Sequence, residues 1–258
     1  MSSPVIYRVD GQIGHIILNR PEKENSLTED LVVRVVEALR VAEEDPDIKV
    51  IILSGEGQNF CGGANLDVLM ALENASETSK WIEMTASLAK TIVDLDKYVV
   101  AAVQGFATGA GFGLALASDF IIADRTAKFS LSFSRLGLIP DMGLTKNLVD
   151  YLPLALAKEW ISSGRIITVE EAYQKGIVNQ IVEGNLYEHA VAFSQFIMDG
   201  PPLSNKYVKH LLNRARYSNL DVALMNENMV QTVLLQTQDH KEAVRAFLEN
   251  RTPKFSGN

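Results

Sequence analysis

The stretch YVVAAVQGFATGAGFGLALA fills residues 98–117, near the middle of the chain. Its β-branched, apolar start at Val99–Val103 predicts a buried strand, and its apolar end predicts a buried helix. Gly109, Gly111 and Gly113 lie where the turn opens that helix. Such a turn presents free backbone N–H groups and the positive end of the helix dipole. The stretch therefore predicts a site for a phosphate or for an oxyanion that develops during a reaction.

The glycine spacing argues against a nucleotide site. Glycines at 105, 109, 111 and 113 do not match the dinucleotide pattern G-x-G-x-x-G, and no G-x-x-x-x-G-K-[ST] phosphate loop is present. Glycines also allow elements to pack closely, so from the spacing alone a purely structural role is as good an interpretation as an oxyanion site.

Length and charge limit the classes of protein that fit. With 258 residues, 47% of them hydrophobic, the chain can bury one sizeable core. A net charge of −8 argues against nucleic-acid binding. Cys61 is the one cysteine, which excludes an internal disulfide and a cysteine-rich metal site. No apolar run is long enough to span a bilayer, and the start lacks a signal-peptide pattern, so we expect a cytoplasmic or organelle-matrix location.

Strand and helix patterns alternate along the first half of the chain. A hairpin is predicted around Asp10-Gly11, and Thr28 is predicted to cap a helix that ends at Asp45-Pro46-Asp47. Further elements are expected as a strand at Val50–Leu53, a long amphipathic helix at Glu77–Leu95, and a strand at Phe120–Ala123. This alternation favours right-handed crossovers and a parallel sheet.

The second half is predicted to be mostly helical from Thr145 onward. Lys128–Phe133 fits either a short strand or an irregular loop, and Pro140 places Ile139 in an extended conformation. Gly200-Pro201-Pro202 is the best internal boundary. We therefore expect a core at residues 1–199 and a helical region at 200–258 that serves self-association.

Several blocks together resemble the crotonase superfamily, the enoyl-CoA hydratases and isomerases. The likeness runs almost end to end, and its blocks are Asn19-Arg20-Pro21, FCGGANL at 60–66, AAVQGFATGAG at 101–111, Ser118-Asp119-Phe120, LGLIP at 136–140, residues 164–172, Gly176-Ile177-Val178 and AFLENR at 246–251. The resemblance implies an α/β, crotonase-like (ClpP/crotonase) spiral of ββα units with a helical C-terminal region. It also implies trimers or dimers of trimers that bind acyl-CoA thioesters, with coenzyme A as part of the substrate and no separate cofactor.

The resemblance also implies an oxyanion hole. Removing a proton from C2 of a thioester requires that the enolate oxygen be stabilised, and loss of one such donor typically costs about 10²–10³ in rate. By family position the donors are the backbone N–H groups of Ala64 and Ala110. Ala110 stands where a glycine is common, but only its N–H is used.

The acid and base differ from those of the hydratases that this chain resembles. Hydratases carry two glutamates, and the corresponding positions here are Gly113 and Phe133. Asp141 lies where some isomerases of the superfamily, including epoxyphenylacetyl-CoA and Δ3,Δ2-enoyl-CoA isomerases, carry their acid/base. An apolar pocket of Phe112, Phe133, Leu138 and Met142 around Asp141 is expected to raise its pKa. The alternative is that Pro140-Asp141, followed by Gly143, forms an ordinary turn.

Other positions are implied in substrate binding. Lys23 and Glu24 would contact the CoA nucleotide, Asn65 and Leu66 would line the path of the adenine and pantetheine, and Phe247 and Arg251 would reach CoA from the C-terminal helix. Gly109 and Phe112 belong to the second glycine turn. Gly113 and Phe133 are expected to leave room for a bulky or aromatic acyl group.

Four functions remain open at this point. The favoured one is an acyl-CoA isomerase that uses Asp141, and the alternatives are a slow or unusual enoyl-CoA hydratase and a non-catalytic CoA-ester-binding homologue. A dehalogenase that uses Asp141 as nucleophile ranks low, because no histidine occurs between 16 and 188. His15, His189, His210 and His240 are scattered, so no metal site is expected.

Overall fold

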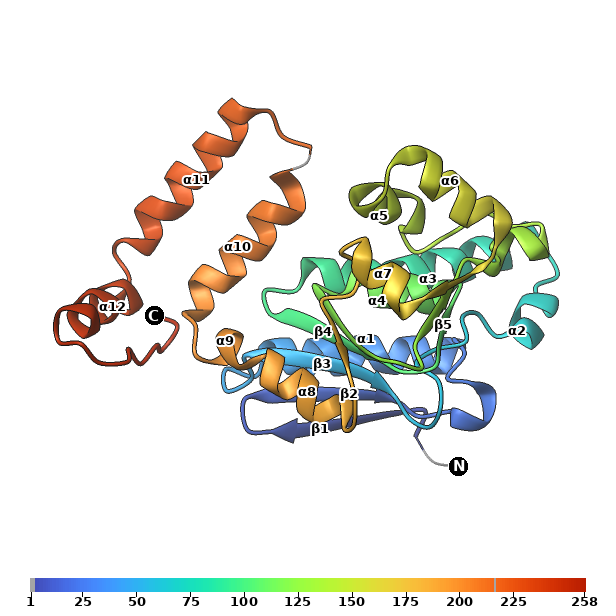
Figure 1. Cartoon of the computed structure of the whole chain (residues 1–258), viewed down its shortest axis with the longest axis horizontal. Coiled ribbons are helices and arrows are strands. Elements are labelled where there is room, and N and C mark those ends of the chain that lie inside the picture. Colours follow the sequence, from blue (N-terminus) through green and yellow to red (C-terminus); the bar gives the residue numbers. More distant parts are fainter. Residues whose placement is uncertain (1–2, 216) are drawn as a thin grey trace.

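The computed structural model (Figure 1) describes residues 3–215 and 217–258. Its main sheet has six strands. The strand order is β1-β2-β3-β4-β6-β9, with bounds β1 Val5–Asp10, β2 Ile13–Leu18, β3 Val50–Gly55, β4 Tyr98–Val103, β6 Phe120–Asp124 and β9 Gln180–Val182. β1 and β2 form the predicted antiparallel hairpin, and every other neighbouring pair is parallel. The predicted hairpin and parallel sheet are both confirmed.

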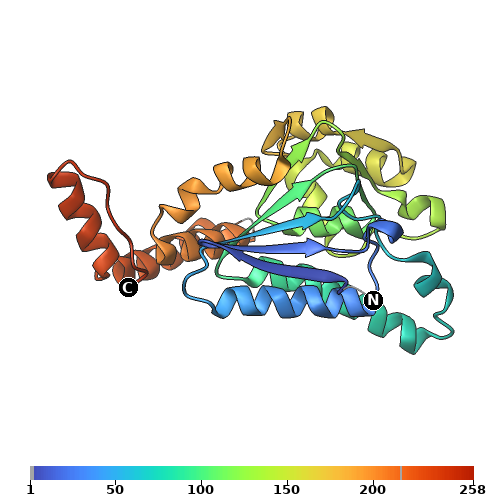
Figure 2. The ribbon, with the colours of Figure 1, turned by 90° about the horizontal axis from the view of Figure 1, so that it is seen from below.

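Helices cover both faces of this sheet. Alternate strand residues such as Ile51, Leu53 and Ala101 point into one cluster with α1 (Glu29–Glu44), α3 (Ala75–Asp94) and α4 (Ala110–Ala117). Their neighbours Ile52 and Val100 point the other way, toward α8 (Leu186–Phe193) and α9 (Gln195–Met198). Figure 2 shows these layers with α1 and the orange helices on opposite sides of the strands. A sheet buried on both faces explains why its strands read as continuous apolar runs.

A second, three-stranded sheet was not predicted as such. It consists of β5 (Phe106–Thr108), β7 (Lys128–Ser130) and β8 (Ile166–Thr168) in that order. β5 lies between β4 and the glycine that opens α4, so the central stretch is two strands and a helix rather than one strand and a helix. Three residues are too few to show an alternating pattern, and for this reason the sequence did not reveal β5 and β8.

The remaining helices of the core surround the second sheet and the loops beside it. They are η1 Pro21–Lys23, α2 Leu66–Met70, η2 Ser132–Leu136, α5 Leu144–Tyr151, α6 Leu154–Ser163 and α7 Val169–Gln174. Thr28 caps α1 as expected, because its Oγ1 accepts a hydrogen bond from the N–H of Leu31. The 128–133 segment combines both of the alternatives left open by the sequence, since β7 is followed by η2.

Three helices extend away from the core at the C-terminal end (Figure 1). They are α10 Pro202–Ala215, α11 Leu220–Leu234 and α12 Gln238–Leu248. α10 is fixed to the core by Lys209, whereas no residue of α11 is buried. Across residues 3–215 and 217–258, no helix combines the length and apolar character needed to cross a membrane.

Candidate functional site

The turn that carries Ala64 is held between two other segments. Cys61 donates its N–H to Phe106 O at 3.0 Å, and Thr108 donates back to Cys61 O at 3.0 Å. On the other side, Leu27 donates to Gly63 O at 2.7 Å, and Asn65 donates to Leu27 O at 3.0 Å. The turn is therefore hydrogen-bonded to β5 and to the segment before α1, which fixes its backbone.

The turn that carries Ala110 lies directly against it. Gly109 has φ 55° and ψ −119°, a combination that glycine adopts readily and other residues avoid. Gly63 has φ 93°, and a Cβ at this position would lie 2.6 Å from Thr108 O and 3.5 Å from Ala110 N. A Cβ at Gly111 would lie 2.2 Å from Cys61 O. Only glycine allows these two turns to approach so closely.

Ala64 and Ala110 keep their backbone N–H groups available. Within residues 3–215 and 217–258, neither N–H has a hydrogen-bond acceptor, although the N–H groups of Gly62 and Asn65 on either side of Ala64's turn are bonded. Ala110 is the first residue of α4, where helix geometry leaves the N–H without a partner inside the helix. Two adjacent free donors beside a helix N-terminus can hold an oxyanion.

Asp141 lies in the loop between η2 and α5. It is half-buried, its backbone oxygen accepts from Leu144 N at 2.9 Å, and its Oδ1 is buried without a partner in the described chain. Burial raises the pKa of the carboxyl group, and a hydrogen bond from its own backbone N–H opposes the increase. A carboxylate with a buried, unpaired oxygen is unusual for a residue that only forms a turn.

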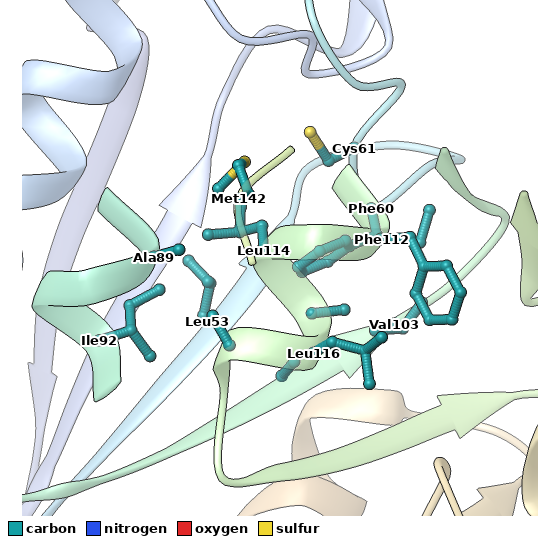
Figure 3. Close-up of a cluster of buried hydrophobic side chains, with 14 of the residues drawn as sticks. Leu53, Phe60, Cys61, Ala89, Ile92, Val103, Phe112, Leu114, Leu116 and Met142 are labelled. Atoms are coloured by element: carbon teal, nitrogen blue, oxygen red, sulfur yellow. The ribbon is translucent and has the colours of Figure 1, made fainter. Parts of the chain in front are cut away.

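The loop that holds Asp141 packs against α4. Met142 follows it with φ 50°, is 2% exposed, and belongs to the same buried cluster as Leu114 and Cys61 (Figure 3). A Cβ at Gly113 would lie 2.9 Å from Met142 Cβ. Met142 therefore fills the space beside Gly113, and the expectation of free room for an acyl group at this position is wrong.

The two aromatic positions of the site differ in their surroundings. Phe133 is 8% exposed and lies beside the second turn, since a Cβ at Gly109 would be 3.7 Å from its Cζ. Phe112 is fully buried, with its ring centroid 4.9 Å from that of Phe129. Phe133 thus borders the site, whereas Phe112 supports it from the core.

Four of the residues implied in CoA binding gather around the first turn. Gly62 donates to Glu24 O at 2.7 Å, and Lys23 precedes Glu24 at the end of η1. Asn65 caps α2 by accepting from Val68 N at 3.2 Å, and Leu66 is 59% exposed beside it.

The other two residues lie elsewhere in the chain. Phe247 is 81% exposed on α12, and Arg251 forms ion pairs with Glu242 and Glu249. α12 stands apart from α4 and its neighbours (Figure 1). Within one chain, Phe247 and Arg251 are therefore not brought together with the two turns.

Asn25 is a residue of the site that sequence reasoning missed. It is fully buried with φ 53°, its Oδ1 accepts from Arg20 N, and its Nδ2 donates to Glu56 O and Asn59 O. Its own backbone oxygen accepts from Cys61 Sγ at 3.2 Å. Asn25 thus connects the 19–25 loop to the Ala64 turn, and an asparagine in a polar loop, where αL backbone is tolerated, was the available signal.

Other clusters of polar groups lie away from this site. The described residues contain no group of three or more His, Cys, Asp and Glu side chains placed to hold a metal ion. A cavity of about 400 Å³ lies at the C-terminal end of α4, with Ser118, Asp119 and Lys146 in its wall. Seven residues of helix, about 10 Å, separate that end from the Ala110 N–H, so this cavity is distinct from the two turns.

Comparison with known proteins identifies a family for this chain. A model of the enoyl-CoA hydratase/isomerase family matches residues 8–258. The 1,2-epoxyphenylacetyl-CoA isomerase of Escherichia coli (strain K12) is 32% identical over 98% of each chain. The 2,3-dehydroadipyl-CoA hydratase of the same organism is 32% identical over 94% of each chain. The crystal structure of an enoyl-CoA hydratase from Polaromonas sp. JS666 matches with a TM-score of 0.94 at 33% identity, covering 97% of this chain and 99% of its own. The predicted α/β, crotonase-like fold is thereby confirmed.

Proposed function

Because the chain belongs to the enoyl-CoA hydratase/isomerase family, we propose that it is an acyl-CoA isomerase that uses Asp141 as its acid/base. In this proposal the enzyme moves a double bond, or rearranges an epoxide or ring, next to a thioester. The observation that carries the proposal is the half-buried carboxylate of Asp141, whose Oδ1 lacks a partner in the described chain, on a loop packed against α4. Gly113 and Phe133, at the positions of the two hydratase glutamates, cannot transfer a proton.

The proposed reaction needs one base and one oxyanion hole. The thioester oxygen of a 3-enoyl-CoA accepts from the N–H groups of Ala64 and Ala110. Asp141 removes a proton from C2, the electron pair moves into the enolate, and the C3–C4 double bond becomes conjugated with it. Asp141 then returns the proton at C4, which leaves the double bond between C2 and C3. No water is activated, so a second carboxylate is not required.

The electrostatics of Asp141 suit this role. Burial raises its pKa, so the carboxylate is a stronger base than an exposed aspartate. Phe133 makes the border of the second turn apolar.

Two other functions have specific support. Relatives of equal similarity include a hydratase, so slow hydration with Asp141 alone is the first alternative. Glycine and phenylalanine at 113 and 133 are also what a CoA-ester-binding protein without chemistry would tolerate. We favour the isomerase because a binding protein gains nothing from a half-buried carboxylate whose buried Oδ1 lacks a partner in the described chain, which costs stability.

The substrate residues and the assembly extend the proposal. Lys23, Glu24, Asn65 and Leu66 surround the first turn and would bind the CoA part of the substrate. Phe247 and Arg251 would contact CoA only in another copy of the chain, in line with the expected homotrimer or dimer of trimers. The uncovered surface of α11 supports that assembly. We retain the cytoplasmic or matrix location as a prediction.

The deciding experiment is an isomerase assay with wild type and Asp141→Asn. Isomerisation of a 3-enoyl-CoA should fall by about 10²-fold or more in Asp141→Asn, because asparagine cannot take the C2 proton. Asp30→Asn, which removes an exposed carboxylate on α1, is the matched control and should retain full activity. The same panel includes a ring-bearing acyl-CoA, hydration of crotonyl-CoA, and binding of a CoA ester.

Each result selects one function. Hydration that exceeds isomerisation would favour the hydratase, and binding without turnover of any substrate would favour the non-catalytic alternative. Isomerisation that survives in Asp141→Asn would remove Asp141 from the mechanism.

A further inference from the structure

Met142, in the loop of Asp141, is restricted in both its backbone conformation and its side chain. Its φ of 50° lies in the left-handed region, which residues other than glycine rarely adopt. Its side chain is almost completely buried. Gly143, which follows it, has φ 76° and caps α5. A non-glycine residue is kept in such a conformation only where its surroundings fix it.

The surroundings that fix Met142 are on α4. A Cβ at Gly113 would lie 2.9 Å from Met142 Cβ and 3.4 Å from Leu144 Cγ, so the loop rests on the bare backbone of this helix turn. Gly113 is three residues, or about 4.5 Å of helix, beyond Ala110, whose N–H is free. The contact therefore holds the residue next to Asp141 about one helical turn from the Ala110 N–H.

The contact between Met142 and Gly113 also limits which side chains fit at position 113. Any side chain at position 113 would meet Met142, and Phe133 leaves the other position apolar. A second acid, which hydration of an enoyl-CoA by this family's usual route requires, has no space unless Met142 moves.

We propose that Met142 is a positioning residue: seated against Gly113, it fixes Asp141 beside the two turns and occupies the volume that an acidic side chain at 113 would need. The inference rests on the proposed function, because it concerns the placement of the proposed acid/base. Met142 touches no substrate in this scheme and acts through its neighbour. The positioning role of Met142 agrees with the state of Asp141 Oδ1. In the described chain no hydrogen bond to Oδ1 holds that carboxylate in place.

Four variants test the contact from both sides. Gly113→Ala adds a Cβ that displaces Met142, so kcat for 3-enoyl-CoA isomerisation should fall about 10- to 100-fold while KM changes little, because the base is misplaced and the CoA contacts are intact. Met142→Gly should also lower kcat. Gly113→Ala/Met142→Gly should be more active than Gly113→Ala alone, because the new methyl group occupies space that the lost side chain vacates. Met142→Leu, which preserves the bulk, should stay within a few-fold of wild type.

A second readout does not depend on activity. The pKa of Asp141, followed by ¹³C NMR of aspartate-labelled protein and assigned with Asp141→Asn, should fall toward the ordinary range in Met142→Gly as water reaches the carboxylate. It should be unchanged in Met142→Leu. This measurement separates the two proposals: a wild type that isomerises nothing overturns the proposed function, while the pKa change still reports on Met142.

Two results would overturn the positioning role. One is a kcat for Gly113→Ala that equals that of wild type. The other is an Asp141 pKa that does not respond to Met142→Gly. If Met142→Gly fails to fold, Met142→Ala gives the pKa comparison, because it removes the side chain beyond Cβ, and Gly113→Ala gives the kcat comparison.

Discussion

Asp141 combines a proposed chemical role with an unfavourable environment. Burial disfavours its charged form, so its pKa in the folded protein is above the ordinary value of about 3.9. Between those two pKa values the folded state holds the proton more tightly than the unfolded state does. The free energy of unfolding contributed by this group therefore decreases as the pH rises through that window.

Because the charged carboxylate of Asp141 lowers the free energy of unfolding, Asp141→Asn should stabilise the protein at neutral pH while it removes activity. The melting temperature of the variant should exceed that of wild type at pH 7, because the buried charge is gone. The difference should vanish below about pH 3.9, where wild type is protonated in both states. Thermal unfolding of both proteins over this range checks the prediction, and equal melting temperatures at every pH would contradict it.

Residue-level roles were only partly accessible from sequence. The family resemblance assigned roles to Ala64, Ala110 and Asp141, and these roles stay predictions. Asn25 was missed as a site residue, and Met142 was expected only in the apolar pocket around Asp141, because their left-handed backbone and burial depend on segments far away in the chain, namely the Cys61 turn and Gly113. The expectation of free space beside Gly113 was wrong for the same reason. A glycine in the sequence indicates that this position has no side chain, but a residue far away in the chain can fill the space.

At the scale of elements, length decided what was predictable. α1 and α3 show a clear helical periodicity, and β3 and β4 are continuous apolar runs. Each has six or more residues, and all were expected near their observed bounds. β5, β8 and β9 have three residues each and take their strand character from their partners. Pairing partners cannot be read from so short a segment.

A buried ion pair is among the contacts that attach α10 to the core. Lys209 Nζ lies 2.8 Å from Asp119 Oδ2 and donates to the backbone oxygens of Ile92 and Lys97. Asp119 also accepts from Val99 N at the start of β4. The pair therefore links the C-terminal helices to two elements of the core.

Breaking this pair should be costly. Lys209→Met leaves the Asp119 carboxylate buried and unpaired, so the free energy of unfolding should fall by about 3–5 kcal/mol. Lys206→Met, at the more exposed pair with Asp96, is the matched control and should cost less than about 1 kcal/mol. Denaturant unfolding at one fixed protein concentration measures both. In Lys209→Met/Asp119→Asn most of the loss should be recovered; a double variant as unstable as Lys209→Met would refute this account.

At the scale of the whole molecule, the C-terminal helices expose an apolar surface. α11 carries Leu220, Met225, Met229 and Val233, each more than half exposed. A surface of this kind on an isolated chain marks an interaction site. The expected partner is a second copy of the chain, as in the assemblies that the family resemblance implies.

The solution mass tests that assembly. Wild type should sediment as three or six copies of the 28.4 kDa chain. Met225→Glu/Met229→Glu should shift the distribution toward the monomer, because it places charges in the interface. Asn228→Glu, on the same helix, is the control for charge alone. A wild type that is monomeric at micromolar concentration would contradict the prediction.

Because Cys61 is buried, the reaction rate of the chain's one thiol can report opening of the turn that carries it. Its side chain is fully buried in the first turn, and burial raises its pKa to about 12. An alkylating reagent thus finds neither access nor thiolate until the Ala64 turn opens. The rate of that single modification, followed by intact mass, reports how often the Ala64 turn opens, and a bound CoA ester that holds the turn closed should slow it.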